Sequence, residues 1–409
     1  MNLLKILNHR FLEKNFNFYI LIFLSGMIAR SFIALNYGDK VLENEWKILV
    51  YNLYNFNSFS MLKFDDFFVP NLWMPPIYGY FIYLHALIFG IEEKLVISVI
   101  ISQIIISSLT TLVFFNIVTF FFKREISILG SIIFCFFPII VFSSSQISSV
   151  TIYLFLFLLF IFFLLKLTKN KSNLLILSIG IISGILVLTR RDFILIYFFS
   201  LIYFFLFFRV DWKKILLTTL VLAITISPYL IRNYIAFDKI ILHSGFGFNV
   251  WKAYNPKAKV EGYYIEEEEL ISKIENVKKD VNYRINQDKI YLKEAKKYIL
   301  DDPIKYFKLF LKRIYSFYFL DLNSTYENYY NLLHTLPNLL LSVLSILGLI
   351  VCKKKNLSLN YLILIMFVIL FIYSFFAILP RYKIYIIPFQ IILSLSFLDF
   401  LLKKLIKKN

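Results

Sequence analysis

The residues of this 409-residue chain with the clearest chemical content are basic side chains that stand beside long apolar runs. Arg190 falls between two such runs, Arg232 follows a third, and Arg381 comes just before a fourth, with Lys383 close behind it. A guanidinium group is always charged and can hold two oxygens of one phosphate at the same time. These four residues are therefore candidates for binding a single phosphate-bearing ligand. Helix-end arginines that only reach toward the membrane surface are the alternative.

Carboxylates follow the first apolar run. Glu43 and Glu45 begin a stretch in which apolar residues recur at helical spacing over 46–53, which predicts a helix lying flat on a membrane surface. A carboxylate held there is partly removed from water, which raises its basicity and suits a general base that deprotonates a hydroxyl group. Asp39 is a rival for the same role, and ordinary solvated carboxylates are the alternative reading.

The segment after Arg232 combines amide, glycine and aromatic residues in a mixture that suits a sugar. Glycine permits tight backbone geometry, whereas asparagine and tryptophan supply hydrogen bonds and a stacking surface. The candidates for binding the sugar or the acceptor in this segment are Asn233, Gly247, Asn249, Trp251 and Asn255. A surface loop without a ligand remains the alternative.

The elements that must position these residues are membrane helices. The chain is 59% hydrophobic and only 17% charged, which excludes a soluble enzyme and a disordered chain. Runs long enough to span a bilayer are expected at 16–35, 96–121, 127–143, 151–168, 173–189, 192–208, 214–231, 336–352, 358–379 and 384–402, with weaker stretches at 76–90 and 304–320. The fold class is therefore an all-α polytopic membrane protein. The net charge of +18 fits contact with anionic lipid and the control of orientation, so nucleic acid is not expected as a partner.

Lysine and arginine gather in alternate short loops, which are expected to face the cytoplasm. With about ten spans, this alternation of loops places 36–93 and 232–335 outside, provided that 76–90 does not cross the membrane. Three parts result: 1–231, a transmembrane catalytic module that includes the external acidic loop 36–75; 232–335, an external hydrophilic segment; and 336–409, the C-terminal transmembrane helices. The sequence contains no phosphate-binding loop, no zinc-spaced cysteine and histidine cluster and no nucleophile elbow, so neither a cofactor nor a metal is expected.

Taken in order, these stretches resemble the GT-C superfamily of integral membrane glycosyltransferases, and the resemblance spans nearly the whole chain. It is greatest to enzymes of the dolichyl-phosphate-mannose-protein mannosyltransferase-like, aminoarabinose-transferase-like and Rgt-type kinds. The matching motifs are the acidic and aromatic start of a juxtamembrane helix at 43–59, Pro-Pro-x-Tyr at Pro75, Pro76 and Tyr78, the Thr-Arg element at 184–190, the Arg-Asn-Tyr element at 228–234, the glycan loop at 247–256, and Arg-Tyr with a following proline at 381–388. Pro76 and Tyr78 thereby join the candidate site, although a purely structural role is the alternative for this element.

The sequence departs from the pattern of the superfamily at three places. The usual aspartate of the first external loop is replaced by a choice among Glu43, Glu45 and Asp39. Ala253 and Tyr254 stand where the glycan loop usually has glycine and asparagine. A further acidic residue that often precedes the fifth span is not evident at 148–151.

The resemblance implies a GT-C type helical bundle with extracytoplasmic juxtamembrane helices and loop, in the inner membrane of a bacterium. It implies inverting transfer of a sugar from a polyprenyl-phosphate donor to a lipopolysaccharide, another glycan or a protein, on the periplasmic face. Glu43 or Glu45 would act on the acceptor hydroxyl, and Arg190, Arg381 and Arg232 would stabilise the departing phosphate. A transporter or lipid flippase is the alternative from another class, and a non-catalytic subunit of an envelope complex is a third. Charges at helix ends and the lack of a visible repeat favour the enzyme.

Overall fold

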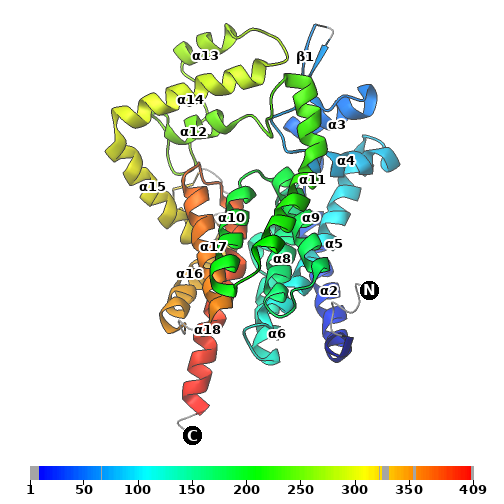
Figure 1. Cartoon of the computed structure of the whole chain (residues 1–409), viewed down its shortest axis with the longest axis vertical. Coiled ribbons are helices and arrows are strands. Elements are labelled where there is room, and N and C mark those ends of the chain that lie inside the picture. The colour runs from blue at the N-terminus through cyan, green and yellow to red at the C-terminus, as the bar shows by residue number, and fades with distance from the viewer. Residues whose placement is uncertain (1–8, 66, 322, 325–330, 353–355, 407–409) are drawn as a thin grey trace.

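The computed structural model of the chain describes residues 9–406, apart from 66, 322, 325–330 and 353–355. Figure 1 shows a bundle of helices that carries a cap of further helices at one end. The bundle contains α2 (His9–Tyr37), α5 (Glu93–Val118), α6 (Arg124–Cys135), α7 (Pro138–Ser143), α8 (Val150–Leu167), α9 (Asn173–Thr189), α10 (Phe193–Phe208), α11 (Trp212–Phe237), α16 (Leu332–Val351), α17 (Leu357–Ser374) and α18 (Ile387–Ile406). The segments outside it are α3 (Asn44–Phe56), β1 (Ser60–Phe64), β2 (Phe67–Pro70), α4 (Pro76–Phe89), α12 (Phe246–Tyr254), α13 (Glu268–Glu275), α14 (Tyr283–Asp301), α15 (Pro303–Tyr318) and the 3-10 helix η2 (Pro380–Tyr385).

Six helices of the described chain are long and apolar enough to cross a membrane. They are α5, α8, α11, α16, α17 and the part of α2 from Asn15 to Tyr37, while α4, α9 and α10 are apolar but shorter. The prediction of a helical polytopic membrane protein is therefore confirmed. Between the described residues, the one sheet is the antiparallel hairpin of β1 and β2, in which Phe64 pairs with Phe67 and Ser60 with Pro70.

Two of the predicted boundaries were wrong. The run 127–143, predicted as one span, forms α6 and α7, because Pro138 lacks a backbone N–H and pushes Phe137 into an extended conformation. The run predicted to end at 231 continues as α11 to Phe237, with Pro228 inside the helix. Arg232 and Asn233 are therefore helical residues and not the start of a loop.

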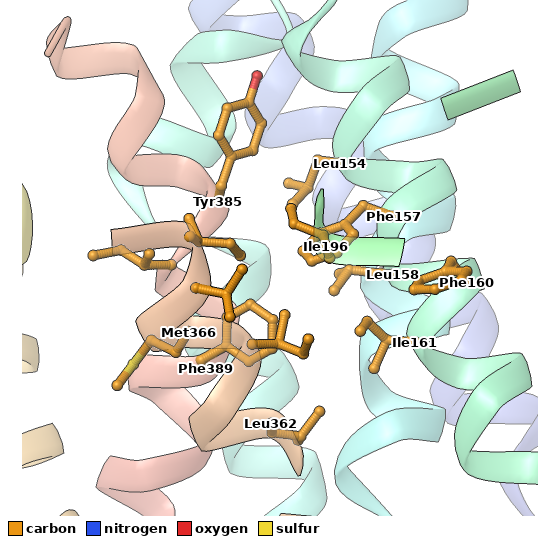
Figure 2. Packing of buried hydrophobic residues seen from close by; sticks show 14 of the residues in the cluster. Leu154, Phe157, Leu158, Phe160, Ile161, Ile196, Leu362, Met366, Tyr385 and Phe389 are labelled. Carbon is orange, nitrogen blue, oxygen red and sulfur yellow. The ribbon is translucent and has the colours of Figure 1, made fainter. Parts of the chain in front are cut away.

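The bundle has one large core that joins both ends of the sequence. Figure 2 shows Leu154, Phe157 and Ile161 of α8 facing Leu362 and Met366 of α17 and Phe389 of α18, and all of these residues are buried. In a membrane, such contacts stabilise helix association through close packing more than through exclusion of water. The C-terminal spans are therefore part of the same packed body as the N-terminal ones.

The hydrophilic segments gather at one end of the molecule. In Figure 1 the hairpin and α12–α14 lie at the top, whereas the start of α2 and the end of α18 lie at the bottom. The basic loops that follow α8 and α10 meet each other, because the Lys171 Nζ donates to the Arg209 carbonyl at 3.4 Å and the Lys214 Nζ donates to the Lys171 carbonyl at 2.8 Å. These two basic loops therefore lie together in the fold.

Candidate active site

Arg190 is surrounded by four tyrosine rings at the C-terminal end of α9. It adopts an extended conformation as the C-cap of that helix, which turns its side chain toward η2. Its Nε donates to the Asp192 Oδ1 at 3.3 Å, and its Nη1 donates to the Tyr385 hydroxyl at 3.3 Å. The guanidinium carbon lies 4.9 to 5.7 Å from the ring centroids of Tyr382, Tyr373, Tyr385 and Tyr153. Cation–π contacts of this kind hold the charge in a partly dehydrated place.

Two guanidinium groups lie over the Tyr382 ring, and a third cation, Lys252, acts on its hydroxyl group electrostatically. Arg190 comes from the end of α9, Arg381 precedes Tyr382 in η2 with its guanidinium carbon 5.8 Å from the ring, and Lys252 comes from α12. Burial raises the pKa of the Tyr382 hydroxyl, but the charges of Arg190, Arg381 and Lys252 outweigh burial and hold this pKa below its ordinary value. We call Arg190, Arg381, Lys252 and Tyr382 the cation cluster. An anion placed against it would meet three positive charges and, beside Arg190, the carboxylate of Asp192.

Asp39 is bound to the loop that precedes α8. Its backbone N–H donates to the Ser145 carbonyl at 3.1 Å, and its Oδ2 accepts the Ile147 N–H at 2.6 Å. Burial raises the pKa of the Asp39 carboxyl above its ordinary value, although the Ile147 N–H acts in the opposite direction. Ile147 precedes α8 and Tyr153 lies in its first turn, so Asp39 and Arg190 each contact a residue near the start of this helix.

The other two candidate carboxylates lie at the start of α3. Glu43 is the exposed N-cap of this helix and makes no side-chain capping bond, whereas Glu45 is half-buried in the first turn. The predicted helix is present, but the prediction that its apolar stripe lies on a membrane surface was wrong, because Leu49 and Val50 are buried inside the protein, Val50 in a cluster with Tyr78 of α4. Of the three carboxylates, Asp39 is the one fixed by a short hydrogen bond from the neighbouring loop.

Arg232 and Asn233 hold the hairpin segment against α11. The Arg232 Nη1 donates to the Asn71 carbonyl at 2.9 Å and to the Asn233 Oδ1 at 2.8 Å, while its Nη2 donates to the Phe59 carbonyl at 3.3 Å. The Asn233 Nδ2 donates to the Ile241 carbonyl at 2.7 Å. The structure therefore attaches Arg232 to the hairpin and does not bring it to the cation cluster.

Lys383 is turned inward from η2. Its Nζ donates to the carbonyls of Tyr318, at 3.0 Å, and of Phe319, where α15 ends. A cation at a helix C-terminus satisfies carbonyl groups that lack partners within the helix. Lys383 thereby fixes η2 to α15. Of the two basic residues of η2, Arg381 is the one that belongs to the cation cluster.

The predicted sugar-binding residues make packing contacts and hydrogen bonds within the cap. Trp251 is 2% exposed and its ring lies 5.3 Å from that of Tyr291 in α14. The Asn255 Nδ2 donates to the Tyr263 carbonyl at 2.7 Å, and the Asn249 Nδ2 donates to the Gly245 carbonyl at 2.6 Å. Gly247 lets α12 pass α14, because a Cβ there would overlap the Asp288 carbonyl.

The proline element has a similar structural use. Pro76 begins α4 as its first residue, where a missing N–H costs nothing. The Tyr78 hydroxyl donates to the Gln103 Oε1 at 2.8 Å, and its ring packs against Trp46 of α3 at 4.8 Å. This contact fixes α3, and with it Glu43 and Glu45, to the bundle.

Comparison with known proteins relates the chain to membrane glycosyltransferases. Residues 74–231 match the family model of dolichyl-phosphate-mannose-protein mannosyltransferase, a stretch that includes Arg190 and Asp192. No curated protein matches the sequence significantly.

Solved structures match over nearly the whole chain. The archaeal oligosaccharyltransferase AglB from Archaeoglobus fulgidus, in complex with an inhibitory peptide and a dolichol-phosphate, is similar with a TM-score of 0.57 and 14% identity, over 96% of this chain and 51% of that one. ArnT from Cupriavidus metallidurans, bound to undecaprenyl phosphate, is similar with a TM-score of 0.56 and 11% identity, over 93% of this chain and 60% of that one. This chain thus spans between half and three fifths of these relatives. These matches confirm the predicted fold class, a GT-C type helical bundle.

Proposed function

We propose that the protein transfers a hexose or pentose from a polyprenyl-phosphate donor to a hydroxyl group of an envelope acceptor, which is a lipopolysaccharide, another glycan or a protein. The observation that carries this proposal is the convergence of Arg190, Arg381 and Lys252 on Tyr382 at the cap end of the bundle. The GT-C fold, shared with structures that hold dolichol-phosphate and undecaprenyl phosphate, supports a lipid-linked donor. The reaction takes place on the periplasmic face of a bacterial inner membrane, where the hydrophilic cap belongs if the basic loops face the cytoplasm.

The chemistry explains why the cations are needed. The acceptor oxygen forms a bond to the anomeric carbon, the bond from that carbon to the phosphate oxygen breaks, and its electron pair leaves with the polyprenyl phosphate. The phosphate gains negative charge as this bond breaks, so fixed cations stabilise the transition state more than the ground state. Asp192 orients Arg190 through Nε. The Asp192 Oδ2 is buried and has no hydrogen-bond partner among the described residues, so it can accept a hydrogen bond from a hydroxyl group of the sugar.

The proton of the acceptor hydroxyl passes to a carboxylate. Asp39 is the preferred base, because burial raises its pKa and the Ile147 N–H fixes its position, whereas Glu43 and Glu45 remain its rivals. A base whose pKa is closer to the working pH accepts a proton more effectively in the transition state.

Transfer by the purified full chain in lipid vesicles tests the proposal. Vesicles are supplied with a panel of polyprenyl-phosphate hexoses and pentoses and an envelope extract, and released polyprenyl phosphate is measured by mass spectrometry. Arg190→Ala, Arg381→Ala and Lys252→Ala should each lower kcat by about 100-fold, which is the usual cost of losing one stabilising group for developing charge. Lys289→Ala, at an exposed position of α14, is the control and should transfer at the normal rate. Full activity of all three variants would refute the assignment of the site.

A comparison of envelope glycans identifies the substrates. A deletion strain should lack one sugar mass in one class of glycan relative to the parent strain. Unchanged glycans, together with no release of polyprenyl phosphate from any donor, would refute the proposed function itself.

A further inference from the structure

Helix α15 presents two different stripes to its surroundings. Ile304, Phe307, Leu311 and Tyr315, spaced three or four residues apart, are 66%, 61%, 48% and 60% exposed. Lys305, Lys308 and Lys312 form an exposed basic stripe beside them. Tyr306, Arg313 and Phe317 are buried on the opposite side, so this face fixes the helix to the protein.

The apolar stripe continues the surface of a membrane-spanning helix. The ring of Phe310 in α15 lies 5.6 Å from that of Phe371 in α17, near the cap end of that span. Phe367 and Phe371 are themselves 51% and 62% exposed, as lipid-facing residues of a span are. In Figure 1, α15 descends from the cap along the side of the bundle that holds α17. The helix therefore passes through the level at which the membrane meets water.

We propose that α15 is an interfacial helix that binds anionic lipid headgroups on the cap side of the membrane. The stripe from Ile304 to Tyr315 inserts among the acyl chains, and Lys308 and Lys312 bind the phosphates. Four large apolar side chains in one row would be unfavourable in water, and long lysine side chains can reach headgroups while their stems stay in the apolar layer. Each lysine near an anionic surface strengthens binding by about fivefold.

The immediate surroundings of the lysines fit this role. Lys305 is tied to the cap, because its Nζ donates to the Pro256 carbonyl at 3.0 Å. The nearest acidic residues along the helix are Asp301 and Asp302, and the Asp302 carboxylate caps the first turn by accepting the Lys305 N–H at 3.0 Å. Lys308 and Lys312 lie one and two turns further toward the bundle, so they are the pair to substitute.

Thermal unfolding of the full chain in mild detergent tests the proposal. Phosphatidylglycerol, phosphatidylcholine or inorganic phosphate is added to wild type, to Lys308→Gln/Lys312→Gln, and to the matched control Lys289→Gln/Lys293→Gln, which removes two exposed lysines at the same spacing from α14. We expect phosphatidylglycerol to raise Tm more than phosphatidylcholine does in wild type and control. The difference between the two lipids should fall by at least half in the α15 variant and return in Lys308→Arg/Lys312→Arg.

Retained phospholipid, measured by mass spectrometry after purification, is the second readout. The α15 variant should retain less phosphatidylglycerol than the control does. An equal difference in Tm between the two lipids in all variants would overturn the proposal, and so would an equal content of retained lipid. A rise in Tm with inorganic phosphate as large as that with phosphatidylglycerol would also overturn it, because it would indicate a site for a free anion and not for a membrane surface.

Discussion

At the scale of single residues, burial and hydrogen-bond partners distinguish the charged groups that are suited to catalysis from those that are not. Asp39, Glu43 and Glu45 lie within a few residues of each other, yet of the three only Asp39 is held by a backbone N–H from the loop before α8. Glu43 is exposed at a helix start. The same contrast separates Arg190, which lies among tyrosine rings, from Arg232, which is bound to backbone carbonyls of the hairpin segment.

The role of Asp39 predicts a specific loss of activity and a specific pH dependence. Asp39→Asn should lower kcat by about 100-fold or more, because an amide cannot accept the proton, whereas Glu43→Gln and Glu45→Gln should each cost less. The base works only when ionised, and its pKa lies above the ordinary value for an aspartate. The acidic limb of the profile of kcat/KM against pH should therefore lie at a higher pH than for an unperturbed carboxyl group. Wild-type activity of Asp39→Asn would move the assignment to Glu43 or Glu45.

At the scale of elements, close crossings hold the bundle together. Gly348 of α16 faces the Leu393 carbonyl of α18, and a Cβ at this position would overlap that carbonyl well inside van der Waals contact. Because α18 follows η2 directly, this crossing also supports Arg381 and Tyr382. Small residues allow membrane helices to approach closely, and the gain in packing is a main source of their stability.

A larger side chain at this crossing should destabilise the fold. Gly348→Ala has to push α16 away from α18, and overpacking of this kind typically costs about 1–3 kcal/mol. Thermal unfolding of the purified variant in detergent should show a lower Tm than wild type. Val343→Ala, which shortens an exposed side chain of the same helix, is the control and should leave Tm nearly unchanged. Equal Tm values for Gly348→Ala and wild type would show that α16 and α18 can move apart without a loss of stability.

At the scale of the whole molecule, the sequence predicted the class of fold but only part of the proposed site. Long apolar runs and basic loops are local signals, so they predict the helical membrane bundle and identify Arg190 and Arg381 as candidates. Lys252 and Asp192 were missed because their roles arise from contacts between elements far apart in the chain. Trp251 shows the converse: its type suits sugar stacking, but it is buried against α14 by partners that no local pattern reveals.

The arrangement of the whole chain also predicts which parts face each side of the membrane. The loop around Lys171 contacts the basic loop between α10 and α11, while the loop around Lys279 belongs to the hydrophilic cap. Lys171→Cys and Lys279→Cys, each in a Cys352→Ser background that keeps the buried Cys135, can be treated in intact cells with a maleimide that does not cross the inner membrane. Lys279→Cys should react, and Lys171→Cys should react only after the membrane is permeabilised. The reverse pattern would place the cation cluster on the cytoplasmic face, where a polyprenyl-phosphate sugar would have to be used before it is moved across the membrane.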